Sequence, residues 1–129
     1  MENNERKLEL TRAEEEIMQI LWDISKGFVK NIVERFPDPK PAYNTVSTIV
    51  RILEAKGFVD HTAFGKTHEY FPLVARDEYR KQFVNSMLKN YFGGSFRQFA
   101  SFFLKNEKLS LRELEEIMNL MKRELGQKP

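Results

Sequence analysis

Hydrophobic residues recur at helical spacing over most of the chain, and the stretch around residue 60 follows the pattern of strands instead. Apolar residues three and four positions apart predict helices. The expected helices are 12–24, 28–36, 41–57, 76–92, 96–104 and 111–125. Segments 58–64 and 67–73 are rich in β-branched and aromatic residues, and Gly65-Lys66 between them predicts a tight turn. The pattern therefore predicts a mainly α chain with one small β-hairpin.

Local signals mark where several of these helices start and stop. Thr11–Glu14 and Ser110–Glu113 each match a capping box, in which a hydroxyl and a carboxylate satisfy free N–H groups at a helix start. Prolines at alternate positions from 37 to 41 rule out a continuous helix, and Gly57 favours a left-handed cap. Helix, helix, turn, helix and hairpin together predict a winged helix-turn-helix over residues 1–74.

The first helix carries two adjoining apolar sides. One stripe consists of Ala13, Ile17, Ile20, Leu21 and Ile24, and Met18 and Trp22 lie beside it. Two apolar sides indicate contact with more than one neighbour. Trp22 is therefore interpreted as a packing residue rather than a platform on which a base stacks.

Helix 41–57 combines a core-facing side with an unusual polar side. The apolar side consists of Ala42, Val46, Ile49, Val50 and Leu53. The opposite side carries Asn44, Ser47, Thr48 and Arg51, with no acid before Glu54. Solvated helix faces are usually filled with Glu and Lys, whereas short polar groups with an Arg suit base edges and phosphates. This pattern favours a DNA recognition helix, although an ordinary amphipathic core helix has the same periodicity.

The candidate DNA contacts follow from this placement. The predicted residues are Lys40, Tyr43, Asn44, Thr45, Ser47, Thr48, Arg51, Lys66 and His68. The polar side of the helix would contact base edges. Tyr43 and Thr45 would lie beside a phosphate, because free N–H groups at a helix start favour an anion. Further phosphates would be bound by Lys66 at the hairpin tip, by Lys40 and by His68.

The charge distribution qualifies this hypothesis. The 129 residues have a formal net charge of +2, yet the part through Val74 has ten Lys and Arg against twelve Asp and Glu, a net of -2. DNA binding would therefore depend on a local basic edge, with nearby acids turned away. The expected edge is Lys40, Arg51, Lys56 and Lys66, and the acids are Glu14, Glu15 and Glu16.

Composition excludes several classes of protein. The absence of Cys excludes disulfide frameworks and thiolate metal sites, and the only histidines, His61 and His68, are interpreted as neutral hairpin residues near phosphate, without metal or cofactor. No apolar run approaches the ~20 residues of a membrane span, so we expect a cytoplasmic protein. The sequence contains no phosphate loop, no Ser elbow and no metal-binding helix motif, so we expect that the protein is not an enzyme.

The last part of the chain, 75–129, is predicted to be a helical dimerisation domain. Three helices of this size would struggle to bury so many aromatic and Met side chains alone, and a partner chain is the economical solution. The expected dimerisation residues are Tyr79, Phe83, Met87, Phe99, Phe103, Leu114, Ile117, Met118 and Met121. A homodimer would place two recognition helices on the half-sites of a palindromic operator in double-stranded DNA.

Four segments together resemble the penicillinase and methicillin-resistance repressors of bacteria. They are LTRAEEEIMQILW, VKNIVERF, AYNTVSTIVRILEAKGFVDH and EYFPLVARDEY, within a resemblance that spans Leu10 to Leu125. The most specific parts are 42–46 and 53–57. The resemblance implies a homodimeric winged-helix transcriptional repressor that regulates antibiotic-resistance or cell-wall-sensing genes.

The resemblance also implies how repression ends. In the family, a membrane metalloprotease sensor that responds to β-lactams acts as antirepressor and leads to cleavage at an Asn-Phe bond in the dimerisation helices. Aligned on Gly93-Gly94 and Leu109-Ser110, that bond falls at Phe102-Phe103, where Phe102 replaces Asn. A sister branch senses copper through C-terminal Cys pairs, which this chain lacks.

Two alternatives stay open at the level of sequence. The acidic balance of the first part of the chain also suits a winged helix that binds another protein. A repressor released by a small ligand, held among the aromatic helices, would have the same domain order.

Overall fold

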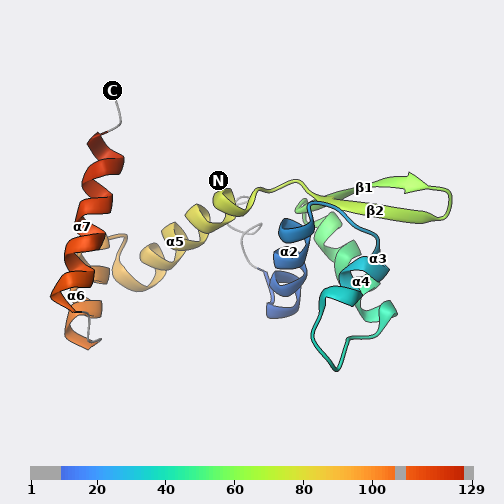
Figure 1. The fold of residues 1–129 in the computed structure, drawn as a ribbon, viewed down its shortest axis with the longest axis horizontal. Helices are drawn as coiled ribbons and strands as arrows, with labels where there is room; N and C mark the ends of the chain where they lie inside the picture. The colour runs from blue at the N-terminus through green and yellow to red at the C-terminus, as the bar shows by residue number, and fades with distance from the viewer. Residues whose placement is uncertain (1–9, 107–109, 127–129) are drawn as a thin grey trace. The chain divides into compact units, whose positions relative to one another are not determined.

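The structure of the chain, a computed structural model, describes residues 10–106 and 110–126, with residues 106, 121, 122 and 124–126 described by their backbone. The elements of this part are α2 (Arg12–Ile24), α3 (Val29–Arg35), α4 (Tyr43–Ala55), β1 (Val59–Phe64), β2 (Thr67–Pro72), α5 (Arg76–Phe92), α6 (Phe96–Asn106) and α7 (Leu111–Gly126) (Figure 1). The chain is mainly helical with one antiparallel hairpin, which confirms the predicted fold class.

The chain divides into two compact units, Met1–Ser86 and Met87–Pro129. The first unit contains α2 to β2 and the beginning of α5, and the second contains the end of α5 with α6 and α7. The functional boundary predicted from the sequence, between residues 74 and 75, lies just before α5 and stays a prediction.

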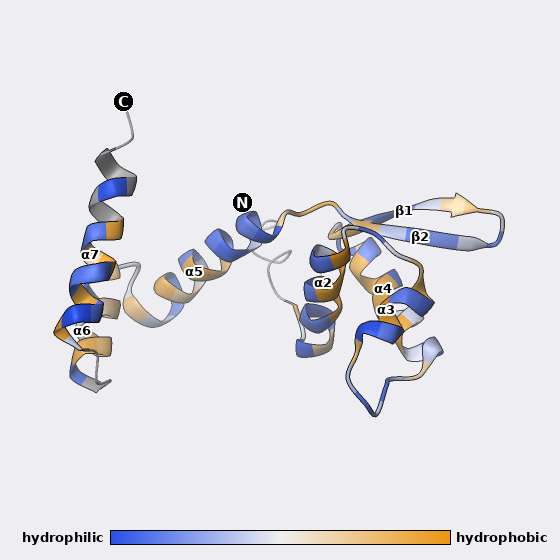
Figure 2. Ribbon diagram, viewed as in Figure 1, coloured by the Kyte–Doolittle hydropathy of each residue, from blue (hydrophilic) through white to orange (hydrophobic). Residues whose placement is uncertain are grey.

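The core of the first unit forms where α2, α3 and α4 meet the hairpin. Its fully buried side chains are Ile17, Met18, Leu21, Ile32, Val46, Val50, Leu53, Phe58 and Val59. The buried side of α4 is therefore the predicted one, and Ile49 packs against its edge. Each such side chain contributes about 1.5 to 3 kcal/mol by leaving water. Figure 2 shows the alternation of hydrophobic and hydrophilic stretches along α2 and α4 that produces this one-sided burial.

Two predicted core positions are wrong. Ala42 is exposed because it is the N-cap of α4, with extended backbone, and so precedes the first helical turn. Ala13 is exposed because the buried side of α2 lies one residue further round the helix, at Glu14, Ile17, Met18 and Leu21. Met18, placed beside the stripe by the sequence, is fully buried where α4 and β2 cover this side of α2.

Glu14 joins the start of α2 to the end of α4. It closes the predicted capping box, since Thr11 N–H donates to its Oε1 at 2.9 Å and its own N–H donates to Thr11 Oγ1 at 3.1 Å. Lys56 Nζ then donates to the same carboxylate at 2.7 Å. Burial raises the pKa of Glu14, but these hydrogen bonds, led by that from Lys56, outweigh burial and lower it below 4.5. Glu14 is thus buried, and the pair occupies Lys56, which the sequence placed on the expected basic edge.

The hairpin is anchored at its base. Val59 pairs with Pro72 and Phe64 with Thr67, and Gly65 takes a φ of 63° in the turn as predicted. Gly27, before α3, adds a further bridge, because its N–H donates to Tyr70 O at 2.9 Å and Tyr70 N–H donates to Gly27 O at 2.8 Å. The hairpin, which is the wing of the winged helix, is thereby fixed to the segment that leads into α3.

The beginning of α5 packs on the first unit. The Trp22 indole N–H donates to Val74 O at 2.8 Å, and its ring lies 5.5 Å from that of Tyr79, which confirms Trp22 as a packing residue. Tyr79 is 5% exposed and donates its hydroxyl hydrogen to Glu15 at 3.0 Å. Burial, followed by the Glu15 carboxylate, raises the pKa of Tyr79. The ring expected at a dimer interface is thus already enclosed by its own unit.

The second unit is held by phenylalanine rings. Phe92, at the end of α5, lies 5.4 Å from Phe99 and 5.7 Å from Phe102 by ring centroids. Gly93 and Gly94 turn the chain with φ of 59° and 78°. The predicted Ser110 capping box is present, since Glu113 N–H donates to the Ser110 hydroxyl oxygen at 3.0 Å and Ser110 N–H donates to the Glu113 carboxylate at 3.1 Å.

Replacing Lys56 with Met should destabilise the chain by about 1 to 3 kcal/mol at neutral pH, because it leaves the buried Glu14 carboxylate without its cation. The folded protein holds Glu14 at a lowered pKa, so this stability is present above about 4.5 and is lost as the pH falls. The difference between wild type and variant, measured by urea unfolding, should therefore shrink on acidification.

Lys26→Met is the matched control. Lys26 lies 4.0 Å from Glu69, and its side chain is 66% exposed, so the same substitution should change stability by less than about 1 kcal/mol. Equal losses in the two variants would contradict the role given to Glu14.

Candidate nucleic-acid interface

The polar side of α4 is open to solvent while its other side is buried. Asn44, Thr45, Thr48 and Arg51 are exposed, and Ser47 is half-buried. Tyr43, in the first turn, is 56% exposed, although an aromatic ring of this size is usually covered. The side chains that the sequence assigned to base edges therefore lie where a large ligand can reach them.

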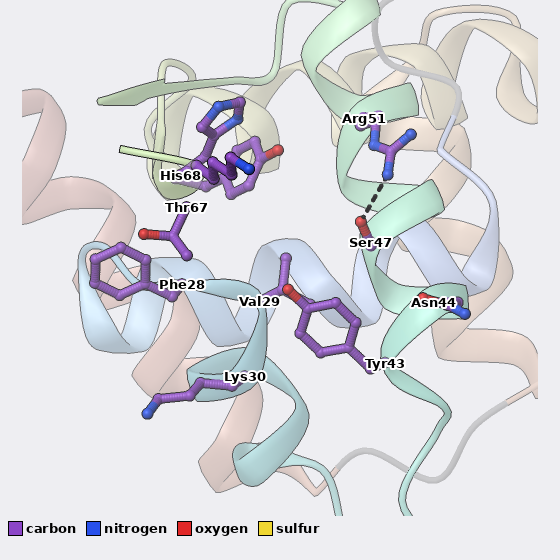
Figure 3. Close-up of a pocket in the computed structure, with 11 residues that line it drawn as sticks. Phe28, Val29, Lys30, Tyr43, Asn44, Ser47, Arg51, Thr67 and His68 are labelled. Atoms are coloured by element: carbon purple, nitrogen blue, oxygen red, sulfur yellow. Dashed lines mark hydrogen bonds between the residues drawn. The ribbon is translucent and has the colours of Figure 1, made fainter. Parts of the chain in front are cut away.

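A groove of about 580 Å³ runs between the start of α3, the polar side of α4 and the wing (Figure 3). Its lining residues are Phe28, Val29, Lys30, Tyr43, Asn44, Ser47, Arg51, Lys66, Thr67, His68 and Tyr70. Six predicted contacts are thus brought together, from α4 and from the hairpin. They are Tyr43, Asn44, Ser47, Arg51, Lys66 and His68.

The remaining predicted contacts lie outside this lining. Thr45 and Thr48 are exposed on α4 beside it. Lys40 donates from Nζ to the backbone oxygens of Glu34 at 3.0 Å and Phe36 at 2.6 Å, so its ammonium group caps the end of α3. An ammonium group at a helix C-terminus is stabilised there by the helix dipole.

Sequence reasoning missed Lys30, Thr67 and Phe28. Lys30 lies on α3, for which the sequence suggested no DNA contact, and it reaches the groove because the Gly27–Tyr70 bridge brings the start of α3 to the wing. The Phe28 ring lies 5.8 Å from that of Phe64, the last residue of β1, and so packs against the hairpin next to its turn. The signal available in the sequence was the Lys after an apolar pair at a helix start, which by itself is common.

The groove is basic even though the surrounding part of the chain is not. Lys30, Arg51 and Lys66 line it, and no lining residue is an acid. Several acids of the first unit are occupied elsewhere, as Glu14 pairs with Lys56 and Asp23 with Arg76 at 2.6 Å. The fold therefore separates cations from acids, so that the net acidic part of the chain through Val74 presents a local cationic surface.

Arg51 is directed along the helix surface. Its Nη2 donates to Ser47 Oγ at 3.1 Å, one helical turn earlier (Figure 3). This bond holds the guanidinium group on the polar side of α4. A planar group with several fixed donors suits either a guanine edge or a phosphate.

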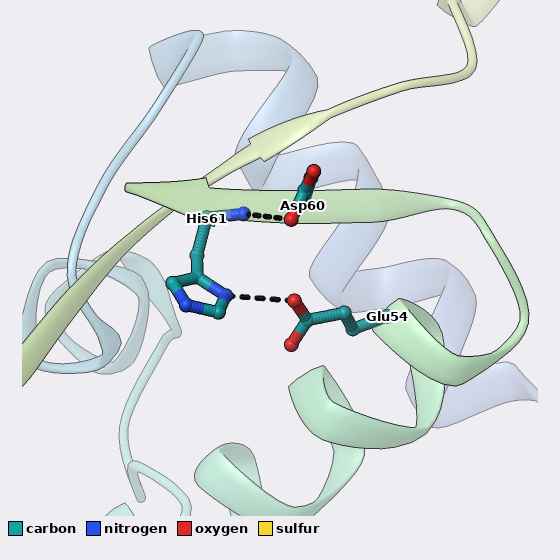
Figure 4. Close-up of side chains that lie close together, drawn as sticks. All are labelled: Glu54, Asp60 and His61. Carbon is teal, nitrogen blue, oxygen red and sulfur yellow. Dashed lines mark hydrogen bonds and ion pairs between the residues drawn. The ribbon is translucent and has the colours of Figure 1, made fainter. Parts of the chain in front are cut away.

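Glu54, Asp60 and His61 form a small polar cluster where α4 meets β1 (Figure 4). One donor atom from each lies within 4.8 Å of the others, a spacing that could hold a metal ion. Each group already has a partner inside the cluster, because Glu54 Oε2 lies 2.7 Å from His61 Nδ1 and Asp60 Oδ1 accepts from His61 N–H at 2.8 Å. The three residues are thus hydrogen-bonded to one another, and they link α4 to the wing.

Comparison with known proteins gives a family match over most of the chain. A family model described as Penicillinase repressor matches residues 10–123. The chain belongs to the penicillinase repressor family. This confirms the resemblance carried by the sequence segments around α2, α4 and the wing.

Individual relatives match over almost their whole length. The methicillin resistance regulatory protein MecI of Staphylococcus aureus (strain N315) is 28% identical over 114 residues, which cover 88% of this chain and 93% of the relative. The penicillinase repressor of Bacillus licheniformis is 22% identical over 121 residues, covering 93% and 94%. That of Staphylococcus aureus is 22% identical over 117 residues, covering 90% and 93%.

The family match extends through the second unit, where large apolar side chains are exposed. In α6 and α7 these are Phe96, Phe102, Phe103, Leu104, Leu111, Ile117, Met118 and Leu120, each 37% to 73% exposed. On α5, Phe83 is 50% exposed. Of the other expected dimerisation residues, Met87, Phe99 and Leu114 are half-buried, and the Met121 side chain lies outside the described part. Among the described residues, no helix is long and apolar enough to cross a bilayer.

Proposed function

We propose that the chain is a homodimeric, sequence-specific DNA-binding repressor that binds a palindromic operator through α4 and the wing. The observation that carries this proposal is the acid-free groove in which α4, α3 and the wing bring Lys30, Arg51 and Lys66 together. A concave cationic surface beside an exposed polar helix face matches a DNA strand that passes between a recognition helix and a wing.

The proposed docking assigns a role to each segment of this surface. The exposed side of α4, from Asn44 to Arg51, enters the major groove and meets base edges. Lys30, Lys66 and His68 bind phosphates, which position the protein without reading sequence. Tyr43 lies at the helix start beside a backbone phosphate.

Dimerisation is proposed to occur through the second unit. Monomeric proteins seldom expose large contiguous apolar patches. In this unit, α6 and α7 expose the eight large apolar side chains named above. Phe103, Ile117 and Met118 are the proposed centre of the contact. Two linked recognition helices gain affinity because the second half-site is bound at high effective concentration.

Cleavage is the proposed route of derepression, with a membrane metalloprotease sensor as the antirepressor. Phe102 and Phe103 lie in α6 and are 53% and 37% exposed. A cut between them would separate the end of α6 and all of α7 from the winged helix. Each winged helix would then bind its half-site alone, and the gain from effective concentration would be lost.

Selection of DNA from a random duplex library tests the proposal directly. The full-length chain should enrich a palindrome, and it should also retain weak, salt-dependent binding to random duplex. Absence of any binding to random duplex at low salt would instead support a winged helix that binds protein.

Replacing Arg51 with Ala should cost about 1 to 3 kcal/mol of discrimination between the selected palindrome and a mutated one, because a base contact is lost. Replacing Lys66 with Ala should weaken binding to all sequences alike and reduce the salt dependence, because a phosphate contact is lost. Fluorescence anisotropy at several salt concentrations separates the two effects. If both variants lost only salt-dependent affinity, the assignment of Arg51 to a base would be wrong.

A chain that ends at Phe103 should keep the circular dichroism of its folded first unit but lose operator binding at concentrations that saturate the full-length protein. The reason is loss of the partner, so the truncated chain should sediment as a monomer. Fusion of an unrelated dimerising coiled coil to the truncated end is the control, and it should restore much of the affinity. Equal operator affinity of truncated and full-length chains would contradict the proposal.

A further inference from the structure

Two stacked histidines connect α4 to the groove. The rings of His61 on β1 and His68 on β2 lie 3.9 Å apart by centroids and are 7° from parallel. On one side of the stack, Glu54 Oε2 lies 2.7 Å from His61 Nδ1, and because a carboxylate only accepts, the imidazole donates (Figure 4). On the other side, His68 lines the groove (Figure 3). The contacts therefore run from a helix carboxylate, through one imidazole, to a second imidazole at the proposed phosphate path.

His68 lies in a cationic part of the groove. Across the groove it shares its lining with the cations Lys30, Arg51 and Lys66 and with the Tyr43 phenol. The Tyr70 ring lies 6.1 Å from it on the same strand, and Tyr70 is itself neutral, since burial and then Glu54 raise its pKa. The Glu54 and Asp60 carboxylates each contact His61.

A phosphate in the groove would be a hydrogen-bond partner for His68. Its negative charge would offset the three cations and would accept a hydrogen bond from a protonated imidazole. Parallel stacking of two imidazolium rings is unfavourable unless each has its own anion. Glu54 lies beside His61, and the phosphate would be the anion beside His68.

We propose that His68 takes up a proton from solvent when a DNA phosphate enters the groove, and that Glu54, acting through His61, holds the His68 ring in place for that contact. This inference rests on the proposed DNA-binding function. His68 is then a phosphate-binding residue whose charge appears on binding, while Glu54 and His61 are positioning residues.

The measurable consequence is a pH dependence of DNA affinity. Histidine is the side chain whose charge ordinarily changes between about pH 5 and 8, and uptake of one proton strengthens binding by at most about tenfold per pH unit. We expect the dissociation constant to fall about fivefold between about pH 8 and about pH 6. The chain has only two histidines, so the assignment by substitution is direct.

The test measures anisotropy of a fluorescein-labelled duplex of random sequence, at constant ionic strength and with EDTA present, for the full-length protein and three variants. His68→Gln removes the titrating ring, and Glu54→Gln removes the anion behind His61. Glu69→Gln is the matched control, because it removes one negative charge from the residue next to His68, where Glu69 pairs with Lys26 at 4.0 Å and faces away from the stack. Thermal unfolding checks that all variants fold.

The proposal expects the affinity gain at low pH in the wild type and in Glu69→Gln, a reduced gain in Glu54→Gln and none in His68→Gln. Equal affinity of the wild type at both pH values, or an unchanged gain in His68→Gln, would overturn it while leaving DNA binding intact. An unchanged gain in Glu54→Gln would overturn the positioning role of Glu54. Absence of binding at either pH would overturn the proposed function itself, so the two failures are distinct.

Discussion

The burial of one side of α4 is the constraint on which the rest of the first unit depends. Val46, Val50 and Leu53 are fully covered by neighbouring elements, and this fixes the rotation of the helix about its axis. Because α4 turns by about 100° per residue, the residues on the opposite side of the helix must face outward, while Ile49 lies at the edge of the core. The exposure of Asn44, Thr48 and Arg51 is therefore a consequence of apolar packing rather than of any attraction among polar groups.

A second consequence of this packing is the sorting of charge. The end of α4 is joined to the start of α2 by the Lys56–Glu14 pair, and its Glu54 reaches the wing at His61. These contacts occupy acids at the edges of the core. The cations that remain, with Lys30 from α3, surround a groove whose lining contains no acid. A sequence whose first part is net negative can thus still present a surface suited to a polyanion.

The two units solve their burial problems differently. The first encloses a hydrophobic core within one chain, and even Tyr79 of α5 is enclosed against Trp22 and Phe58. The second gathers Phe92, Phe99 and Phe102 by ring contacts but leaves many large side chains of α6 and α7 in solvent. Helices of this size have too little volume to enclose so many rings, and this asymmetry is the physical basis of the proposed division between a DNA-binding unit and an association unit.

The sequence by itself determined the order and type of the elements, because helical and strand periodicity, two capping boxes and the glycine turns are local signals that act within a few residues. It also determined which side of α4 is polar, since that follows from spacing alone. Only the tertiary structure decided that Glu14 is buried and paired with Lys56, 42 residues away, and that Met18 rather than Ala13 faces the core. Only the tertiary structure also placed Lys30 and Thr67 in the groove and stacked His61 on His68. These contacts join segments that are distant in the chain, and periodicity carries no information about which distant segments meet.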